Sequence, residues 1–405
     1  MPELTIIADD LTGAADCGIA FTVAGLPTFV AFGMEPAPAE ARIVAVDTDS
    51  RALPAFASAE RAHAAARLAY RRGSRTIYKK IDSTLRGNVG PEIAAIFRAA
   101  GEARGRALVI LSPAFPSMGR TMREGRVLVN GVPVEQTEVW QKSGMTGPSE
   151  PVAMLTRAGL KAVNVLLDGI RRGALLETDA EVLVCDAETE NDLTLIARAG
   201  AALQTAVVWA GSAGLARHLP AALGLRPSEP IAASARWAEG PALALVGSRS
   251  SIAREQARLL AEEPGVEAFT LDPEMLAAGE RGAGWNRAAA ALEHALDAGR
   301  DALLVIDAGE RVDLARGPLL AAALGRLAAA QAGRIGSLIV TGGDIARAAL
   351  KAMGASGLYL LSEVEPGVPI GLTDTARPLR VITKAGAFGT AQTLQHCRAA
   401  LKRKG

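Results

Sequence analysis

Residues 4–24 read LTIIADDLTGAADCGIAFTVA, and this stretch decides the fold. Five apolar or β-branched residues come first, which predicts a buried strand over 4–8. An alanine-rich segment follows, with apolar positions three and four residues apart, which predicts a helix over 13–24. A strand that leads directly into a helix begins a βαβ unit, and such units build parallel sheets. We therefore expect an α/β fold.

The same alternation continues along the whole chain. It predicts further strands at Thr28–Phe32, Ile43–Val46, Thr76–Ile81, Leu108–Leu111, Val182–Cys185, Val207–Trp209, Leu243–Val246, Ala268–Leu271, Leu303–Ile306, Ser337–Thr341, Leu358–Leu361 and Arg380–Thr383. It predicts further helices at Pro54–Arg72, Gly90–Ala100, Thr189–Ala202, Ala213–Leu223, Ser251–Glu262, Asn286–Ala298, Gly317–Ala332, Asp344–Met353 and Phe388–Lys402.

The length of the chain predicts more than one domain, because 405 residues exceed what one hydrophobic core usually organises. The segment 225–240 contains Pro227 and Pro230 and has no sustained period, so it is expected to be a linker. The predicted arrangement is two doubly wound domains, residues 1–225 and 240–405, with mostly parallel sheets and a cleft between them.

The composition excludes several classes of partner. Lysine and arginine number 44 against 43 aspartates and glutamates, and a net charge of +1 is not that of a binder of nucleic acid or of an anionic membrane. Three widely spaced cysteines without a CxxC pair suit a reducing compartment. Neither a signal peptide nor an apolar run long enough to span a membrane is visible. We expect a soluble, cytoplasmic protein.

Ligands of doubly wound sheets bind where strands end, and the first strand ends in acids. Asp9 and Asp10 come directly after it, and Thr12 and Asp16 follow within eight positions. One such residue suffices to cap a helix. The cluster therefore favours a function over capping alone: a carboxylate that acts as general base, or that binds a substrate hydroxyl or Mg²⁺.

Two more predicted strands end in cations. Arg51, in DTDSR (47–51), either pairs with the acids beside it or binds a substrate carboxylate through two parallel hydrogen bonds. The segment YKKIDSTLRGN (78–88) contains two of the eight lysines, together with hydroxyl groups and an arginine. Such a set of side chains can bind a small polyhydroxylated anion, and a solvated turn is the alternative interpretation. Arg120, in the segment 113–121, is a candidate second anion contact.

The second half of the chain has three glycine- and hydroxyl-rich turns, at GSRSS (247–251), TGGD (341–344) and KAGAFG (384–389). Where side chains are missing, backbone amides can approach phosphate oxygens, and a helix N-terminus favours negative charge. Three such turns in one domain predict a nucleotide phosphate site, although none matches the P-loop or the GxGxxG fingerprint. The four histidines have no metal-binding spacing, so we expect no histidine metal site.

In their order along the chain, these motifs resemble those of the four-carbon acid sugar kinases. The resemblance spans nearly the whole chain and rests on IADDLTGAAD (7–16), DTDSR (47–51), KKIDSTLRGN (79–88), PAFPSMGRT (113–121), VCDAETENDL (184–193), AGSAGLA (210–216), GSRS (247–250), TGGD (341–344) and TKAGAFG (383–389). It implies that residues 1–225 bind the sugar acid, that residues 240–405 bind ATP, and that phosphoryl transfer with Mg²⁺ takes place across the cleft.

Carried over motif by motif, the resemblance implies individual roles. The substrate contacts would be Asp9, Arg51, Lys80, Asp82, Ser83, Thr84, Leu85 and Arg86. For a kinase of this kind, we expect the catalytic residues to be Asp9, Asp10 and Arg86, with Asp9, or else Asp10 or Asp82, accepting the hydroxyl proton. The nucleotide contacts would be Ser248, Ser250, Thr341, Gly342, Gly343, Asp344, Gly386, Ala387, Phe388 and Gly389, and no residue is assigned to a metal.

Within that family, DDLTGAADCGIAF (9–21) is similar to members that act on D-threonate, which implies transfer to its terminal (4-) hydroxyl; D-erythronate and 3-oxo-tetronates are the alternatives. A two-lobed sugar-acid sensor without catalysis would use the same cations but would not need the glycine-rich turns. A nicotinamide-dependent dehydrogenase is disfavoured because GxGxxG is missing. The expected partners are the sugar acid and ATP, and a homodimer is left open.

Overall fold

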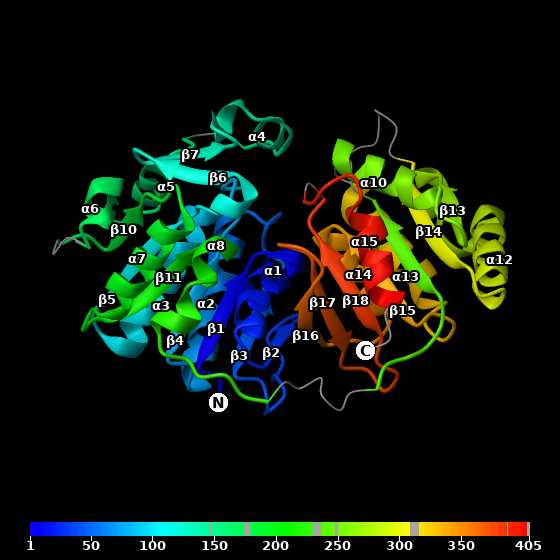
Figure 1. The fold of residues 1–405 in the computed structure, drawn as a ribbon, viewed down its shortest axis with the longest axis horizontal. Coiled ribbons are helices and arrows are strands. Elements are labelled where there is room, and N and C mark those ends of the chain that lie inside the picture. The colour runs from blue at the N-terminus through cyan, green and yellow to red at the C-terminus, as the bar shows by residue number, and fades with distance from the viewer. Residues whose placement is uncertain are drawn as a thin grey trace. The chain divides into compact units, whose positions relative to one another are not determined.

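The computed structural model describes residues 1–145, 148–173, 179–229, 236–247, 250–307, 316–386 and 388–402. The chain divides into two compact units, unit 1 over Met1–Pro230 and unit 2 over Ile231–Gly405. Each unit has a mostly parallel sheet flanked by helices (Figure 1). This arrangement confirms the predicted α/β fold class.

The main sheet of unit 1 is parallel throughout and runs in the order β2-β3-β1-β4-β11-β5-β10-β9. Its strands are β1 (Leu4–Ala8), β2 (Thr28–Ala31), β3 (Ile43–Asp47), β4 (Thr76–Lys80), β5 (Ala107–Ser112), β9 (Ala162–Val165), β10 (Val182–Cys185) and β11 (Ala206–Gly211). Every residue of β1 is buried, as in strands that are covered on both faces. The opening stretch of the sequence therefore forms an interior strand of the sheet.

Helices cover both faces of this sheet. α1 (Leu11–Val23) leads from β1 towards β2, whereas α2 (Ala55–Arg71) and α3 (Val89–Arg104) lead across the sheet in the opposite direction. Because parallel crossovers are right-handed, α1 lies on one face, and α2 and α3, which pack together, lie on the other. The reversal places a topological switch point at β1 and its neighbours β3 and β4, where such sheets bind ligands.

Between β5 and β10 lie elements that the sequence analysis did not predict. β6 (Arg120–Arg123), β7 (Arg126–Val129) and β8 (Val132–Pro133) form a small antiparallel sheet. Asn130 and Gly131, in the turn before β8, have φ of 49° and 79°, and an Asn-Gly pair is a strong hairpin signal that was available in the sequence. The same region adds the short helices α4 (Glu138–Lys142), α5 (Pro151–Arg157) and α6 (Leu167–Arg171).

Two predicted helices are corrected by the structure. The helix expected over 213–223 is broken into α8 (Ala213–Ala216) and α9 (Leu219–Ala222), because Pro220 in the first turn of α9 has no amide hydrogen to continue the earlier helix. The helix expected from Phe388 begins only at Thr393, as α15 (Thr393–Lys402). α7 (Glu190–Ala201) begins with a capping box, in which the side chains of Thr189 and Asp192 each accept from the other residue's amide.

The sheet of unit 2 runs in the order β13-β14-β12-β15-β18-β17-β16. Its strands are β12 (Ala242–Val246), β13 (Val266–Leu271), β14 (Asp301–Ile306), β15 (Ser337–Thr341), β16 (Gly357–Glu363), β17 (Pro369–Thr373) and β18 (Arg380–Lys384). The strands from β13 to β18 in this order are parallel, and β17, which the sequence analysis missed, is antiparallel to both of its neighbours.

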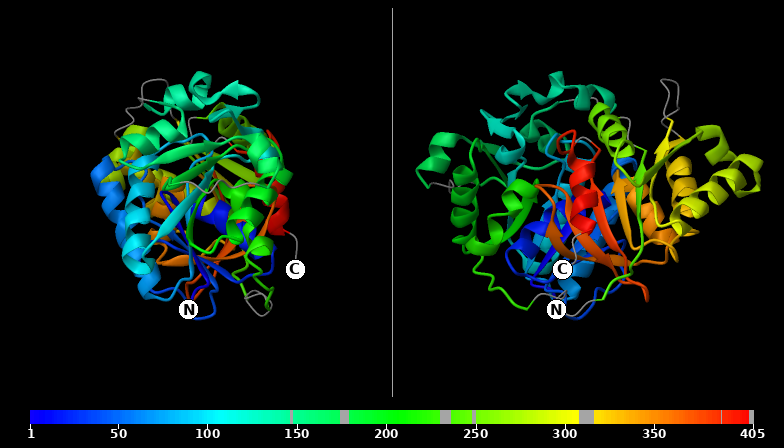
Figure 2. Two further views of the ribbon diagram at one scale, coloured as in Figure 1. Left: turned by 90° about the vertical axis from the view of Figure 1, so that its left-hand side faces the viewer. Right: turned by 45° about the vertical axis from the view of Figure 1, so that its right-hand side comes forward.

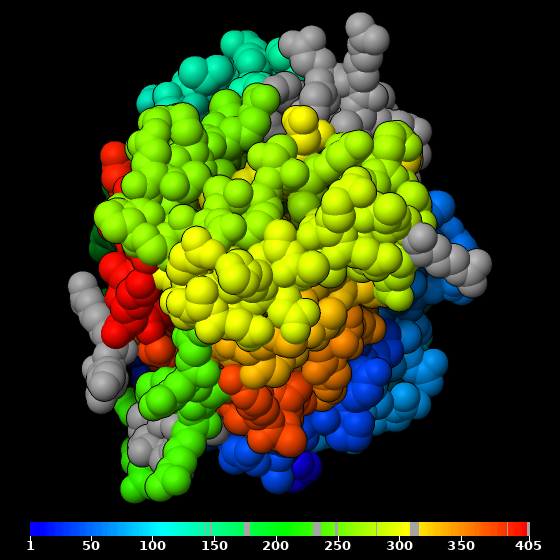
Figure 3. Space-filling model, turned by 90° about the vertical axis from the view of Figure 1, so that its right-hand side faces the viewer, coloured from blue at the N-terminus to red at the C-terminus, as the bar shows by residue number. Residues whose placement is uncertain are grey.

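Helices also cover both faces of the second sheet. The helices are α10 (Ser251–Ala261), α11 (Pro273–Ala278), α12 (Ala283–Asp297), α13 (Gly317–Ala329) and α14 (Gly343–Ala352), together with α15. α10 and α15 pack together on one face, where α15 (red) lies against the strands in the right-hand view of Figure 2, and α13 and α14 pack together on the other. Figure 3 shows α12 (yellow) at the surface of this unit.

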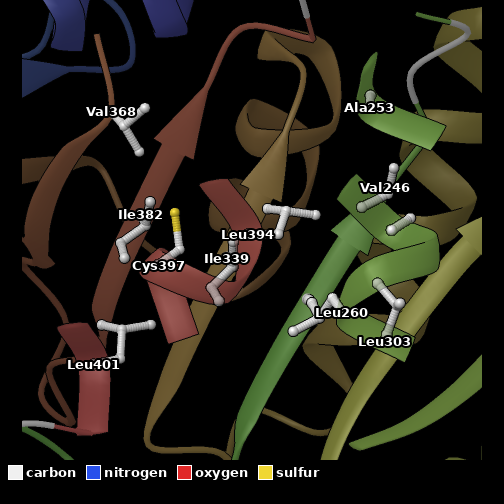
Figure 4. Close-up of a cluster of buried hydrophobic side chains, with 12 residues drawn as sticks. Val246, Ala253, Leu260, Leu303, Ile339, Val368, Ile382, Leu394, Cys397 and Leu401 are labelled. Atoms are coloured by element: carbon white, nitrogen blue, oxygen red, sulfur yellow. The ribbon is translucent and has the colours of Figure 1, made fainter. Parts of the chain in front are cut away.

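The core beneath α10 and α15 is aliphatic. Figure 4 shows its buried side chains from strands and helices, among them Val246, Leu260, Leu303, Ile339, Ile382, Leu394, Cys397 and Leu401. This core fixes the carboxyl ends of the strands relative to the two helices that follow β12 and β18. None of the helices in the described ranges combines the length and the apolar character needed to cross a membrane.

Candidate functional site

Three loops of unit 1 meet at the carboxyl edge of its sheet, at the switch point. Ala8 of β1 is in register with Asp47 of β3, and Ile7 is in register with Lys79 of β4, so the loops after these strands start side by side. The third loop approaches the first closely: a Cβ on Gly87 would lie 2.8 Å from Oδ2 of Asp9. The structure therefore brings together the three charged motifs of the N-terminal half.

Arg51 lies between two carboxylates. Its Nε and Nη2 donate to Oδ2 and Oδ1 of Asp9 at 2.7 and 2.8 Å, and its Nη1 donates to Oδ2 of Asp10 at 2.6 Å. This forked pairing is the one that a planar guanidinium makes best. Asp10 is also the N-cap of α1, because its Oδ1 accepts from the amide of Gly13 at 2.8 Å. The partners of Arg51 thus come from the β1 loop rather than from the acids next to it in sequence.

The pairing fixes the charge state of Asp9. Burial by itself would raise the pKa of this carboxyl group, which is 4 % exposed, but the charge and hydrogen bonds of Arg51, with Lys79 and Lys80 nearby, hold its pKa below the ordinary value. Burial opposes the charge of Arg51 as well, yet Asp10 and Asp9 raise the pKa of its guanidinium. Asp9 is therefore an ionised acceptor for a hydroxyl group.

The loop after β4 contains a second forked pair. Nε and Nη2 of Arg86 donate to Oδ2 and Oδ1 of Asp82, both at 2.9 Å, and Asp82 also accepts from the amide and hydroxyl of Thr84. Burial opposes the charge of Asp82, but Arg86 holds the pKa of this carboxyl group well below its usual value. Ser83 is buried in the same loop, and Leu85 has φ of 61°, a strained conformation that is concentrated at functional sites.

Lys80 is a buried cation at the same edge, and its charge helps to lower the pKa of Asp9 and of Asp82. It is 4 % exposed, and nothing in the described parts of the chain forms a hydrogen bond or an ion pair with its ammonium group. It lies against the start of α1, where a Cβ on Gly13 would be 3.2 Å from Nζ. Because an unpaired buried charge is costly, this position is one that an anionic ligand would stabilise.

Arg120, the candidate second anion contact, is the first residue of β6 in unit 1. Its Nη1 donates to the carbonyl of Met118, and its Nε is buried without a hydrogen bond to any described residue. Burial lowers the pKa of Arg120, and the charges of Asp82 and Arg86 act on it as well, the first raising and the second lowering it. The arginine of the proline-rich segment therefore belongs to the same charged region.

Three turns of unit 2 meet at one edge in the same way. Thr341, the last residue of β15, is in register with Val246 of β12 on one side and with Lys384 of β18 on the other. The chain leaves β12 through α10 and β15 through α14 in opposite directions across the sheet, which makes these neighbours the switch point of unit 2.

The turn at Gly342 and Gly343 has open space around its first glycine. Gly342 has φ of 105°, and a Cβ on it would meet nothing within 4 Å. α14 starts at Gly343, so its first amides have no partner within the helix. Thr341 is fully buried, and its hydroxyl oxygen has no hydrogen-bond partner among the residues described. Asp344 is exposed in the first turn of α14.

The turn after β18 is anchored by buried polar groups. Lys384 is fully buried, its Nζ donates to the carbonyl of Ala385 at 3.0 Å, and burial lowers its pKa to about 8, although Cys397 and Glu365 act in the opposite direction. Gln256 on α10 donates to the carbonyl of Phe388 at 3.1 Å.

The remaining predicted nucleotide contacts differ in their surroundings. Ser250 is the N-cap of α10, and Gly386 follows Lys384 by two positions. Gly389 is closely packed, since a Cβ on it would lie 2.2 Å from Oγ1 of Thr393. Ser248 and Ala387 lie outside the described residues.

Comparisons with known proteins identify the family. Residues 4–219 match a family described as a sugar-binding N-terminal domain, and residues 243–394 match one described as a nucleotide-binding C-terminal domain. Together with the relatives below, these matches show that the chain belongs to the four-carbon acid sugar kinase family.

Several relatives match over nearly the full chain. A D-threonate kinase of Cupriavidus necator is 41 % identical, with 96 % of both chains covered. A D-threonate kinase of Salmonella typhimurium is 33 % identical, with 97 % of this chain and 96 % of the relative covered. A 3-oxo-tetronate kinase of Cupriavidus necator is 31 % identical, with 96 % and 94 % covered. A crystal structure of a Haemophilus influenzae protein has a TM-score of 0.73 at 21 % identity, covering 98 % of this chain and 100 % of that one, and shows the same fold.

Proposed function

We propose that this protein is an ATP-dependent kinase that phosphorylates the terminal (4-) hydroxyl of D-threonate. Lys80 carries the proposal, because this buried ammonium group has no partner among the described residues and lies at the edge where an α/β sheet binds its ligand. The carboxylate of a small sugar acid supplies the missing anion. The two relatives that are D-threonate kinases support the choice of acid.

We assign the sugar acid to residues 1–225. Lys80 binds the substrate carboxylate, and Arg51 and Arg86 contribute the outer edges of their guanidinium groups. The side chains of these two arginines remain 26 % and 32 % exposed although each is paired on one side, so each can face a ligand. Asp82 and the hydroxyls of Ser83 and Thr84 complete the pocket as hydrogen-bonding groups for the substrate hydroxyls.

Asp9 is assigned to the reacting hydroxyl group. It accepts a hydrogen bond from the 4-hydroxyl; as this oxygen forms a bond to the γ-phosphorus, the bond from phosphorus to the bridging oxygen breaks, ADP leaves, and the hydroxyl proton passes to Asp9. Because Arg51 lowers the pKa of Asp9, the proton moves late, as suits a loose transition state. Asp10, which is bound to Arg51 and caps α1, is the alternative base.

We assign ATP to residues 240–405. The amide of Gly343, at the start of α14, binds a phosphate oxygen, and the buried hydroxyl of Thr341 lies two residues before it. The carboxylate of Asp344 is an oxygen donor of the kind that Mg²⁺ prefers, so the residues fit a Mg²⁺ ion held mostly by phosphate oxygens and water. When bound, Mg²⁺ neutralises the charge of the phosphates.

The test uses the full-length protein with ATP, Mg²⁺ and a panel of four-carbon sugar acids. ADP release is measured for D-threonate, D-erythronate and 3-oxo-tetronates, and phosphorus NMR identifies the hydroxyl that carries the phosphate. We expect the highest kcat/KM with D-threonate and a 4-phosphate product. A preference for another acid of the panel changes the substrate, and binding of an acid without turnover leaves the sensor alternative. Cytoplasmic location and a homodimer stay predictions.

A further inference from the structure

Behind the pair of Asp9 and Arg51 lies a buried network that the assignments above do not use. Its centre is Glu92, which is 1 % exposed in the first turn of α3. One carboxylate oxygen of Glu92 accepts from Oγ of Ser50 at 2.5 Å, and the other lies 2.5 Å from Nζ of Lys79. Ser50 and Lys79 are themselves 0 % and 1 % exposed. A carboxylate is favoured near the positive end of a helix, and removing either partner of this buried pair would leave the other charge uncompensated.

The network reaches Arg51 through the backbone of its loop. The hydroxyl oxygens of Thr48 and Ser50 lie 2.8 Å apart, and the Thr48 hydroxyl donates to the carbonyl of Ala8 at 2.8 Å. The amides of Ser50 and Arg51 both bond to the carbonyl of Asp9, at 3.0 and 3.2 Å. The loop that presents Arg51 is therefore bound to β1 on one side and to Glu92 of α3 on the other.

The two adjacent lysines of β4 have different surroundings. Successive side chains of a strand point to opposite faces of the sheet, so Lys79 points towards α3 and Lys80 towards α1. Lys79 is neutralised by Glu92, whereas Lys80 has no partner in the described ranges. The pairing of Lys79 thus belongs to the framework of the site, and the free Lys80 to its ligand.

We propose that Glu92 is a positioning residue, which holds Ser50 and thereby sets the position of the Arg51 guanidinium that binds the sugar acid. The substrate part of this inference rests on the proposed function. Glu92 itself is covered and touches no ligand. Through Ser50 and the loop it acts on the acid by way of Arg51, so the effect of Ser50→Ala on acid binding must disappear when Arg51 is absent.

The experiment is a double-mutant cycle in the full-length protein. Ser50→Ala breaks the link between Glu92 and the loop but keeps the pair of Lys79 and Glu92, and it is the mildest variant of the network. Ser58→Ala is the matched control, since Ser58 is also 0 % exposed but donates to the carbonyl of Ala55 within α2. Dissociation constants for D-threonate and for ADP are measured by calorimetry, together with KM, kcat and thermal stability.

We expect Ser50→Ala to weaken D-threonate binding about tenfold, with ADP binding unchanged, and Ser58→Ala to leave both unchanged. In the Arg51→Ala background, Ser50→Ala should have no further effect on D-threonate. A tenfold effect that persists without Arg51, or no effect of Ser50→Ala in the presence of Arg51, overturns the inference. Glu92→Gln, which keeps an oxygen acceptor for Ser50, should have a smaller effect on D-threonate binding than Ser50→Ala.

A second readout does not depend on the identity of the substrate. The Nε–H group of Arg51 donates to Asp9 at 2.7 Å, so it should give a slowly exchanging ¹⁵N NMR signal, which Arg51→Lys would assign by its loss. We expect this signal to be lost or to exchange quickly in Ser50→Ala and to remain in Ser58→Ala. An unchanged signal in Ser50→Ala contradicts the inference even if the protein phosphorylates another acid. Failure of the proposed function appears separately, as an unmodified protein that phosphorylates no four-carbon acid.

Discussion

The two units place their candidate sites by the same topology, but the loops at the two sites contain different kinds of residue. In each unit, three neighbouring parallel strands end at one edge, and the helices that follow adjacent strands cover opposite faces. In unit 1 the loops beyond these ends carry charged side chains such as Asp9, Arg51 and Arg86; in unit 2 they carry glycines and hydroxyls around Gly342. The sheet determines where a ligand binds, and the side chains of the loops determine which ligand it is.

The difference has a physical reason. A small sugar acid has one charge and several hydroxyls, and charged side chains in fixed forked pairs can distinguish them. A triphosphate has many equivalent oxygens, which backbone amides and a helix N-terminus can bind without side chains. The site of unit 1 therefore needs acidic side chains that hold its cations in place. The site of unit 2 needs glycines, because a Cβ would fill the space next to the backbone amides.

The largest effect is expected at Asp9, the proposed proton acceptor at the charged edge of unit 1. Asp9→Asn removes the proton acceptor and leaves Arg51 with one carboxylate, so we expect kcat to fall about 100-fold or more, with a smaller change in KM for ATP. Because the pKa of Asp9 is lowered, Asp9 stays ionised on mild acidification, and kcat of the unmodified enzyme should show no loss from this group between about pH 7 and pH 5. A sigmoidal loss of kcat near pH 6 that Asp9→Asn abolishes would contradict this account.

The second prediction distinguishes the two lysines of β4, Lys79 and Lys80, by their effects on binding and on stability. Lys80→Met removes a buried cation that has no direct ion pair in the described ranges, so D-threonate binding should weaken about 100-fold. The free energy of unfolding should fall less than in Lys79→Met, because only the attraction of Lys80 to Asp9 and Asp82 is lost. Lys79→Met leaves Glu92 buried without its counter-charge and should lower the free energy of unfolding by about 3–5 kcal/mol. Calorimetry and urea unfolding measure the two quantities. The account is wrong if the two variants lose the same amount of stability.

The third prediction concerns Lys384, a buried lysine at the unit 2 edge, and the pH dependence of stability. Burial lowers the pKa of Lys384 from 10.5 to about 8, so between these values the unfolded chain binds more protons than the folded chain. The free energy of unfolding should therefore rise with pH from about 8 to 10.5, by an amount on the order of 3 kcal/mol from this group. Lys384→Met should lack this rise. Urea unfolding at a series of pH values measures it, and parallel curves for both proteins would refute the prediction.

The sequence predicts where the charged and glycine-rich loops begin, because strand ends are local features. The run from Leu4 to Asp16 shows a buried strand, its end and the following helix within thirteen letters, and the register of β12, β15 and β18 brings the three glycine-rich turns to one edge as the α/β pattern implies. The helix broken at Pro220 was predictable from the proline, and the hairpin at Asn130 from its Asn-Gly pair.

The partners of the charged residues were not predictable in the same way, because they are distant in sequence. Arg51 binds Asp9 and Asp10 across 42 and 41 positions, rather than the acids beside it. Glu92 gave no signal, since an acid in the first turn of a helix is common. The opposite directions of Lys79 and Lys80 follow from strand geometry, but which of the two would be paired depends on what α3 places opposite.

The most direct measurement of the division between the two units is calorimetric titration of D-threonate and of ADP into the full-length variants Lys80→Met and Gly342→Val. Gly354→Val, at another positive φ just after α14, controls for backbone strain. We expect Lys80→Met to lose D-threonate and keep ADP, and Gly342→Val to keep D-threonate and lose ADP, each loss about 100-fold. Loss of ADP binding in a folded Lys80→Met, or of D-threonate binding in a folded Gly342→Val, would contradict the account.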